Sequence, residues 1–374
     1  MKDINSQSIR TLERMISDSG RICIVTHMKP DGDAIGSSVA LYHYLRMCGK
    51  TGVRIILNDR HPGYLSFLTE DMPRENLIVH KEMPSEAEIC LKDSDLIFCL
   101  DFNAFHRTDR LEPVLNNSKA DKILIDHHLT PDIASFELSF SETDISSASE
   151  LLFHILMETR MIAHDATMLP QASAAALMTG MTTDTNNFAN STFPSTLRMA
   201  SSLLAAGVDR DGILSNLYNN YSEKRLRLMG HMMKDLMKIT PDGVAYIVLD
   251  RKTQTEYNVS EGDTEGFVNM PLSIADIRMS LLLKEDEDRI RVSIRSKKGT
   301  SANTCARKYF NGGGHENAAG GKLIIPADVP GIEAAAEYIE TYTHKYLTED
   351  EIVKDMHADT GSNDRSQFVH KGEA

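Results

Sequence analysis

Residues 21–33 read R-I-C-I-V-T-H-M-K-P-D-G-D, and this stretch decides the fold. Its first six residues form a short apolar run, which predicts a strand buried on both faces. The polar residues that follow contain Pro and Gly and predict a loop. Over residues 34–47, apolar side chains then recur at helical spacing. A strand, an acidic loop and a helix together make one unit of an α/β fold.

The same alternation continues along the chain to about residue 210. Further apolar runs predict strands over 53–57, 96–100 and 122–125, and helical spacing predicts helices over 149–161 and 171–178. Strands that alternate with helices favour a mostly parallel sheet with helices on both faces. We therefore expect a first domain of this kind over residues 1–221.

A second, smaller domain is expected after a connecting helix. Over residues 222–242 the pattern predicts a linker helix, with Leu226, Met229, Met233 and Leu236 on one apolar stripe. A strand over 243–249 opens an α+β domain that we place at 243–348. The remaining residues, 349–374, are polar and are predicted to be disordered. A length of 374 residues suits about two domains.

Charge and composition exclude several classes of protein. The chain carries 54 acids and 40 bases, a net charge of −14, which argues against duplex DNA and anionic membranes as partners. No apolar run is long enough for a transmembrane helix, and the N-terminus lacks the apolar segment of a signal peptide. The five cysteines show no C-x-x-C spacing, so we expect free thiols and a reducing cytoplasm.

Acids and histidines gather where three predicted strands and one helix end. A lone Asp after a strand is usually a turn or cap residue, and Asp33 is positioned to cap the following helix. The joint pattern is harder to dismiss, because the carboxyl ends of parallel strands form the ligand crevice of such sheets. The residues that we expect to meet there are His27, Asp31, Asp33, Asp101, His127 and Asp184.

Four carboxylates in one crevice would repel each other unless cations neutralised them. Together with two imidazoles they offer about six ligands, which suits two divalent ions that share one carboxylate. Mixed oxygen and nitrogen ligation fits Mn²⁺, with Mg²⁺, Fe²⁺ and Co²⁺ as alternatives. A two-metal site is typical of in-line hydrolysis of phosphate esters.

The expected second domain contains a basic segment beside a glycine-rich loop. Residues 289–308 hold seven bases and no acid, and strand alternation places Arg289, Arg291 and Arg295 on one face. The loop over 311–321 surrounds His315 with glycines, which let backbone amides approach an anion. A solvated strand and a flexible turn are the alternatives to a phosphate-binding surface. We favour the phosphate-binding surface, with Arg295 as its strongest candidate.

These clusters, in this order, resemble the DHH phosphoesterase superfamily. The motifs are D-H-H at 126–128, H-x-x-x-D-x-D at 27–33, D-x-N at 101–103 and T-D-T at 183–185. The G-G-G-H of 312–315, with Arg295-Ser296 upstream, resembles the DHH-associated C-terminal domain. Two compact domains over about residues 15–345, without an added module, are similar to the NrnA-type group of oligoribonucleases and adenosine 3′,5′-bisphosphate phosphatases.

The resemblance implies a role for each residue of the first domain. One metal would be held by His27, Asp31 and Asp101, and the other by Asp33, Asp101, His127 and Asp184, so that Asp101 bridges the two. His128 would face the scissile phosphate as electrophile or proton donor. Asp126 would orient a histidine. Asn103 and Arg107, which follow Asp101, would contact the substrate.

In the second domain the resemblance implies a hold on the terminal phosphate and base of the substrate. The residues implied are Arg295, Ser296, Gly313, Gly314, His315 and Asn317. Glu316 departs from the neutral or basic residue that is usual at its position.

The expected activity is hydrolysis of very short single-stranded RNA to nucleoside 5′-monophosphates, and of adenosine 3′,5′-bisphosphate to AMP. Linear or cyclic dinucleotides are the alternative substrates. The remote alternative function is that of a non-catalytic nucleotide-binding module. The oligomeric state stays open, a homodimer included. Seven clustered bases suffice for a few phosphates only, so the charge favours a short substrate.

Overall fold

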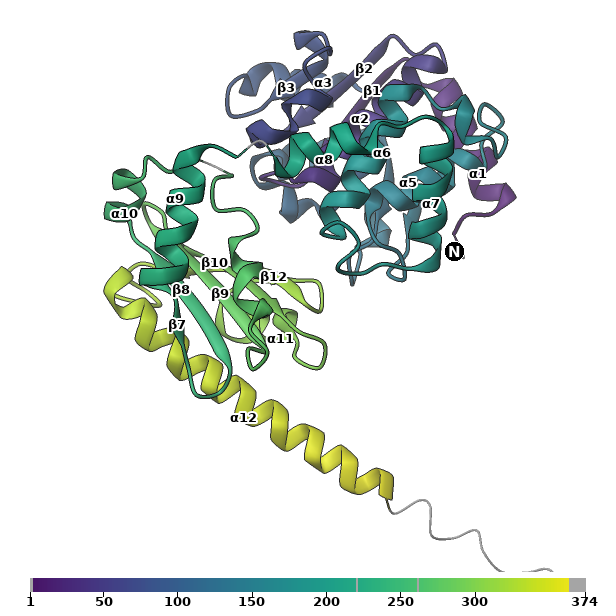
Figure 1. Cartoon of the computed structure of the whole chain (residues 1–374). Coiled ribbons are helices and arrows are strands. Elements are labelled where there is room, and N and C mark those ends of the chain that lie inside the picture. Colours follow the sequence, from purple (N-terminus) through teal and green to yellow (C-terminus); the bar gives the residue numbers. More distant parts are fainter. Residues whose placement is uncertain (1–2, 220, 261, 363–374) are drawn as a thin grey trace, which may run out of the picture. The chain divides into compact units, whose positions relative to one another are not determined.

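The computed structural model describes residues 3–219, 221–260 and 262–362. The chain separates into two compact units, Met1–Asn220 and Tyr221–Ala374, each built on a six-stranded sheet (Figure 1). The division falls beside residue 222, where the sequence places the start of the linker helix. Within the described residues, no helix is both long enough and apolar enough to cross a membrane.

The first unit contains a sheet in which all six strands run parallel, as the sequence predicts. The strands are β1 (Arg21–Thr26), β2 (Gly52–Leu57), β3 (Leu77–Val79), β4 (Leu96–Leu100), β5 (Asp121–Asp126) and β6 (Leu138–Ser141). Their order is β3-β2-β1-β4-β5-β6. The order therefore reverses between β1 and β4, and doubly wound sheets bind their ligands outside the carboxyl ends of the strands at this switch point.

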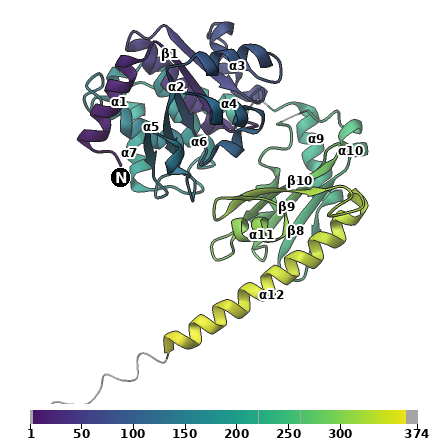
Figure 2. The same cartoon turned by 180° about the vertical axis from the view of Figure 1, so that it is seen from behind.

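Helices cover both faces of this sheet (Figure 2). They are α1 (Ser6–Asp18), α2 (Gly32–Met47), α3 (Pro84–Asp93), α4 (Glu112–Asn117), α5 (Ala148–Met157), α6 (Gln171–Asp184), α7 (Pro194–Ala205) and α8 (Arg210–Tyr218). Ile22 and Ile24 of β1 pack into the core with α2, α5 and α6, whereas Cys23 and Val25 pack into a second core with α3 and α4. Burial on both faces explains why the strands are apolar without interruption.

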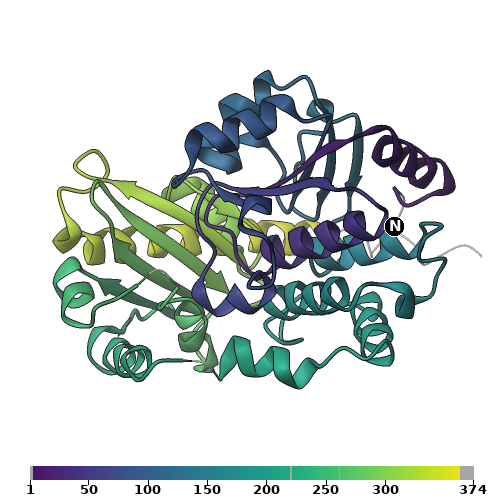
Figure 3. The ribbon, with the colours of Figure 1, turned by 90° about the horizontal axis from the view of Figure 1, so that it is seen from above.

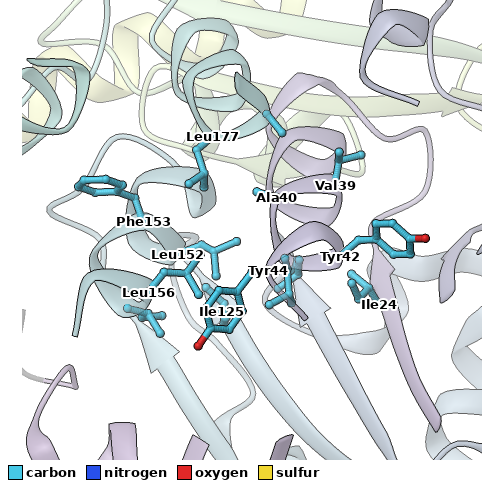
Figure 4. Packing of buried hydrophobic residues seen from close by; sticks show 14 of the residues in the cluster. Ile24, Val39, Ala40, Tyr42, Tyr44, Ile125, Leu152, Phe153, Leu156 and Leu177 are labelled. Atoms are coloured by element: carbon cyan, nitrogen blue, oxygen red, sulfur yellow. The ribbon is translucent and has the colours of Figure 1, made fainter. Parts of the chain in front are cut away.

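The larger core joins the three helices whose ends carry acids. Figure 4 shows side chains of α2, α5 and α6 gathered over β1 and β5, among them Tyr44, Leu152 and Leu177. All three side chains are buried. The first turn of α2, the first turn of α5 and the last turn of α6 are thereby held by one packed cluster.

The second unit has the α+β architecture that the sequence predicts. Its strands, green arrows in Figure 3, are β7 (Lys238–Ile239), β8 (Val244–Leu249), β9 (Met279–Glu285), β10 (Arg289–Ser296), β11 (Gly313–Gly314) and β12 (Ala318–Ile324). They lie in the order β11-β12-β10-β9-β8-β7, with β8 and β9 parallel and the other pairs antiparallel. Its helices are α9 (Glu223–His231), α10 (Arg251–Glu256), α11 (Ala302–Tyr309) and α12 (Ala335–Ser362).

The predicted linker helix is shorter in the structure, and three of its four stripe residues, Met229, Met233 and Leu236, pack against the core. Helix α9 ends at His231, a π-helical turn follows over Met232–Leu236, and β7 begins at Lys238. Leu228 and Met232 are buried, whereas Leu226 is 49% exposed. Apolar residues lie on two neighbouring faces of this segment, and packing against β8 and β9 selects between them.

The predicted disordered tail also differs from the structure. Helix α12 continues past residue 349 to Ser362. This segment is polar, so polarity alone does not predict where the helix ends. Residues 363–374 of the predicted tail lie outside the described residues.

Candidate metal-dependent active site

The first group of site residues surrounds His27, just after β1. The His27 Nε2 atom lies 3.4 Å from Asp101 Oδ2 and 3.8 Å from Asp31 Oδ1. Asp31 is also the N-cap of α2, where its Oδ1 accepts hydrogen bonds from the backbone amides of Asp33 and Ala34. The prediction that Asp33 caps this helix is therefore wrong, because the Asp33 side chain is buried within the site instead.

The second group surrounds His127, just after β5. The His127 Nε2 atom lies 3.4 Å from Asp101 Oδ1, 3.4 Å from Asp184 Oδ2 and 3.8 Å from Asp33 Oδ2. Asp184 stands at the end of α6 and is the most exposed of these side chains. Asp101 thus presents one carboxylate oxygen to His27 and the other to His127.

Asp101 has an unusual backbone conformation for a residue other than glycine. It follows β4 directly with a φ of 61°, and its amide donates a hydrogen bond to the carbonyl of Ile125 on β5. Asp and Asn enter this left-handed region more readily than other side chains. Such conformations cluster at functional sites, where the surrounding structure maintains them.

Helix α5 contributes to the site in a way that the sequence did not reveal. The two oxygens of Asp33 accept hydrogen bonds from the backbone amides of Ala148, at 2.6 Å, and Ser149, at 2.9 Å. These amides belong to the first turn of α5, whose N-terminus carries partial positive charge. A sequence separation of more than 100 residues hid this contact. The only local signal is Ser147, which caps the same helix.

These residues fit a divalent metal. Two sets, His27-Asp31-Asp101 and Asp33-Asp101-His127, each offer three ligand atoms within 4.8 Å of one another. Separations of 3.4 Å exceed ordinary hydrogen-bond lengths, and two ligands about 2.1 Å from a shared tetrahedral ion would stand about 3.4 Å apart. The mixture of carboxylate and imidazole donors is suited to such ions.

The electrostatics of the cluster also favour a cation. Burial alone would lower the pKa values of His27 and His127, but the carboxylates around them, Asp101 above all, raise both to about 10. Burial and the charges of Asp101 and Asp184 raise the pKa of Asp33 well above its usual range. The carboxylates therefore favour positive charge at the two histidines, and a metal ion bound there would compete with protons.

Asp126 and His128 form a buried pair beside these groups. Asp126, the last residue of β5, accepts a hydrogen bond of 2.8 Å at Oδ1 from His128 Nδ1. The same Nδ1 lies 3.7 Å from Asp101 Oδ1. The carboxylate thus fixes the orientation of the second histidine in the D-H-H motif, while the first histidine faces the acids.

Asn103 and Arg107 link the loops that carry these groups. The Asn103 amide donates a hydrogen bond of 2.8 Å to the carbonyl of Leu129, beyond β5. The Arg107 carbonyl accepts one of 2.8 Å from the amide of Met28, beyond β1. Both residues therefore lie at the carboxyl edge of the sheet, where the sequence places a substrate contact.

In the second unit, two of the predicted substrate residues brace a turn. The Asn317 amide donates to Ser296 Oγ at 3.0 Å and to the carbonyls of Lys297 and Thr300 at 3.1 Å. The Ser296 hydroxyl also donates to the carbonyl of Thr300. Ser296 and Asn317 thus hold the turn that follows β10.

The glycine-rich loop forms a hairpin between β11 and β12. Gly313 and Gly314 pair with β12, and the His315 amide donates to the carbonyl of Ala318 at 2.7 Å. Glu316 accepts a hydrogen bond at 3.0 Å from the hydroxyl of Ser301, the N-cap of α11. The residue that departs from the family pattern is therefore engaged with this helix end.

The arginines of β10 lie on one face, as alternation predicts. Arg291 pairs with Asp286 at 3.2 Å, and Arg289 lies 3.7 Å from Asp288. The guanidinium of Arg295 donates to the carbonyl of Ile294 at 2.9 Å. Two of the three arginines therefore contact acids of the preceding turn, whereas Arg295 lies beside the hairpin strand β12, with its Nη1 3.4 Å from the carbonyl of Ala319.

Comparison with known proteins agrees with this geometry. Residues 21–181 match the DHH family, N-terminal domain, and residues 233–341 match the DHHA1 domain. Two relatives are named bifunctional oligoribonuclease and PAP phosphatase NrnA. The one from Thermus thermophilus is 30% identical, over 81% of this chain and 84% of its own length. The one from Bacillus subtilis is 27% identical, over 83% of this chain and 92% of its own length.

A solved structure from Bacteroides fragilis, described as an exopolyphosphatase-related protein, is 35% identical to this chain. It aligns with a TM-score of 0.84 over 94% of this chain and 99% of its own. The sequence matches extend over most of the chain and include the sheet edge at which the acids and histidines meet. This chain therefore belongs to the DHH family of metal-dependent phosphoesterases, with a DHH domain followed by a DHHA1 domain.

Proposed function

We propose that this protein hydrolyses very short single-stranded RNA to nucleoside 5′-monophosphates and adenosine 3′,5′-bisphosphate to AMP. Relatives that are named for these two activities support the proposal. The observation that carries it is the placement of Asp101, whose two oxygens face two different histidines. A carboxylate in this position can bridge two ions, and two-metal sites hydrolyse phosphate esters.

We assign two divalent ions, Mn²⁺ by preference and Mg²⁺ or Co²⁺ as alternatives, to the two groups. His27, Asp31 and Asp101 would hold one ion, and Asp33, Asp101, His127 and Asp184 the other. When bound, the ions lower the pKa of a water molecule and stabilise the attacking and leaving oxygens of the phosphate.

The protein itself supplies rigidity and a proton. Asp33 is held by the first turn of α5, so its carboxylate is in place before an ion arrives. Asp126 orients His128, and we assign to His128 the donation of a proton to the leaving oxygen through its other ring nitrogen. A buried carboxylate bonded to one ring nitrogen fixes the orientation of the imidazole, so that the other ring nitrogen can face the substrate.

The second unit would select the substrate. The hairpin of β11 and β12, with Arg295, His315 and the Ser296–Asn317 pair, would hold the terminal phosphate and base. Asn103 and Arg107 would contact the substrate beside the metals. Seven clustered bases in a chain of net charge −14 suit one or two phosphates better than a long backbone.

A panel of substrates tests the proposal. Purified protein with Mn²⁺ is incubated with an RNA dinucleotide, a pentamer, a 24-mer, adenosine 3′,5′-bisphosphate, linear pApA and a cyclic dinucleotide. We expect fast hydrolysis of the dinucleotide and pentamer, measurable hydrolysis of the bisphosphate, and little of the 24-mer. Preference for pApA or the cyclic dinucleotide would favour the alternative, a dinucleotide phosphodiesterase. Binding without hydrolysis would indicate a nucleotide-binding module.

The substitution Asp101→Asn tests the bridging carboxylate. Asn accepts the same backbone conformation but removes the charge. We expect activity to fall by roughly 10²- to 10³-fold or more, without unfolding. The matched control is Asp93→Asn at the exposed end of α3. Near-full activity of Asp101→Asn with Mn²⁺ would contradict the two-metal assignment.

A further inference from the structure

Helices α2 and α6 pack together more extensively than any other pair of elements in the described residues. At their crossing each helix contributes a glycine. A Cβ atom at Gly36 would lie 2.6 Å from the carbonyl oxygen of Ala176 and 2.8 Å from the amide nitrogen of Gly180. Both of these atoms belong to the backbone of α6, so no side-chain rotation could make room for the added carbon.

The glycine on α6 is enclosed on its other side by the metal site. A Cβ atom at Gly180 would overlap the hydroxyl of Ser149 and would lie 2.9 Å from Asp33 Oδ1. Ser149 belongs to the first turn of α5, and its amide holds the Asp33 carboxylate. Three helices therefore meet at Gly180 without space for a side chain.

The crossing lies about one helical turn from two of the carboxylates. Asp33 precedes Gly36 by three residues on α2, and Asp184 follows Gly180 by four residues on α6. One turn of helix spans 3.6 residues. A change in the distance between the helices at the glycines therefore also changes the distance between the two carboxylates, one helical turn away.

We propose that the close contact of Gly36 with Gly180 sets the separation of the Asp33 and Asp184 carboxylates, and thereby the metal affinity of the position that they share with His127. Both glycines are positioning residues in this sense. The inference rests on the proposed two-metal function. The other position depends less on the crossing, because two of its three ligands, His27 and Asp101, follow strands β1 and β4, and only Asp31 lies at the end of α2.

Calorimetric titration of the full chain with Mn²⁺ tests the proposal. Wild type is expected to bind two ions. Gly180→Ala is expected to bind one ion as wild type does and the other about 10- to 100-fold more weakly, the loss that is typical when the support of a ligand is removed. Gly230→Ala is the matched control, because Gly230 lies in helix α9 with nothing within 4 Å of the added carbon. It should bind both ions as wild type does.

The double variant Gly180→Ala with Ser149→Gly separates folding from positioning. It removes the overlap with Ser149 but keeps the approach to Asp33 Oδ1. We expect its melting temperature to recover toward that of wild type while the weaker metal affinity remains. Wild-type affinity for both ions in either folded variant would overturn the inference.

Two further outcomes are equally decisive. Failure of both variants to fold would overturn the inference, because the crossing would then serve the core rather than the site. Binding of one Mn²⁺ by the wild-type protein would overturn the two-metal function itself. This outcome is read from wild type alone and is therefore distinct from any result obtained with the variants.

Discussion

The two units satisfy their polar groups in different ways. At the sheet edge of the first unit, carboxylates and histidines face each other at 3.4–3.8 Å. In the hairpin region of the second unit, Ser296 and Asn317 bond to each other and to backbone carbonyls. The first arrangement gathers like charges and fits a cation, whereas the second pairs its polar groups within the chain. The proposed metal site can therefore be recognised from its closely spaced charges. The proposed anion site in the hairpin has no such cluster and is recognised from its backbone geometry.

The largest expected effect is that of metal removal, to which the two units should respond differently. Chelation with EDTA should reduce hydrolysis to background, and added Mn²⁺ should restore it. Ligand binding stabilises the folded state that holds it, so hydrogen exchange around residues 27–33 and 126–128 should slow when Mn²⁺ is added. Exchange in the hairpin at 311–321 should not change. Equal slowing in both regions would contradict the contrast.

A second prediction concerns the pair of Asp126 and His128. Asp126→Asn should lower kcat by roughly 10²- to 10⁴-fold, because it disturbs the orientation of the histidine. Mn²⁺ binding should be unchanged in calorimetry. The control is Asp132→Asn, an exposed acid in the loop that follows. Loss of metal together with activity would place Asp126 among the ligands instead.

Arg295→Ala should affect the second unit alone. We expect KM for adenosine 3′,5′-bisphosphate to rise roughly tenfold, since a hydrogen bond to a charged group is lost, with metal binding unchanged. Arg289→Ala serves as the control, because this arginine lies on the same face of β10 but beside Asp288. If both variants behave alike, the basic face acts as a diffuse charge and Arg295 has no special role.

The smallest effect is expected at Glu150, which supports the helix that holds Asp33. Its carboxylate accepts hydrogen bonds from the amide of Ser146 at 3.1 Å and from the hydroxyl of Thr196 at 2.7 Å. Glu150→Gln should lower the free energy of unfolding by about 1–3 kcal/mol. Glu158→Gln, at the exposed C-cap of the same helix, should have little effect.

The stabilisation by Glu150 should also depend on pH. Burial alone would raise the pKa of Glu150, but His154, Ser146 and Thr196 outweigh it and lower the pKa to about 2. A carboxyl group whose pKa is depressed by folding contributes stability above its unfolded pKa, and this is lost as the pH falls toward the folded value. Melting temperatures of wild type and Glu150→Gln should therefore differ fully above pH 5 and converge gradually as the pH falls toward about 2. A constant difference would show that Glu150 acts through packing alone.

Residues close in sequence predicted the frame of the first unit well. Strands β1 and β4 begin and end where their apolar runs do, because burial on both faces leaves no polar residue inside the strand. The ends of these strands then brought His27 and Asp101 together, since parallel strands share one carboxyl edge. The sheet edge could therefore be predicted from a few short segments.

Contacts between distant segments could not be predicted in this way. No local pattern connects Asp33 to the first turn of α5, and the role of Asp31 as the cap became clear only once Asp33 was seen to be buried. Of the predicted linker stripe only Leu226 is exposed, because the buried face also includes Leu228 and Met232. The bonds of Ser296 and Asn317 depend on a turn whose shape the sequence does not specify.

The left-handed backbone at Asp101 bears on how this protein could evolve. Side chains other than Asp, Asn and Gly are disfavoured in that conformation, so few residues can replace Asp101 without a cost to folding. Asn differs from Asp by one base in its codon and accepts the same backbone conformation, yet it carries no charge. A single base change can therefore produce a copy of this protein that folds but is catalytically inactive. Among related sequences, the residue at position 101 would therefore distinguish catalytically active members from inactive ones.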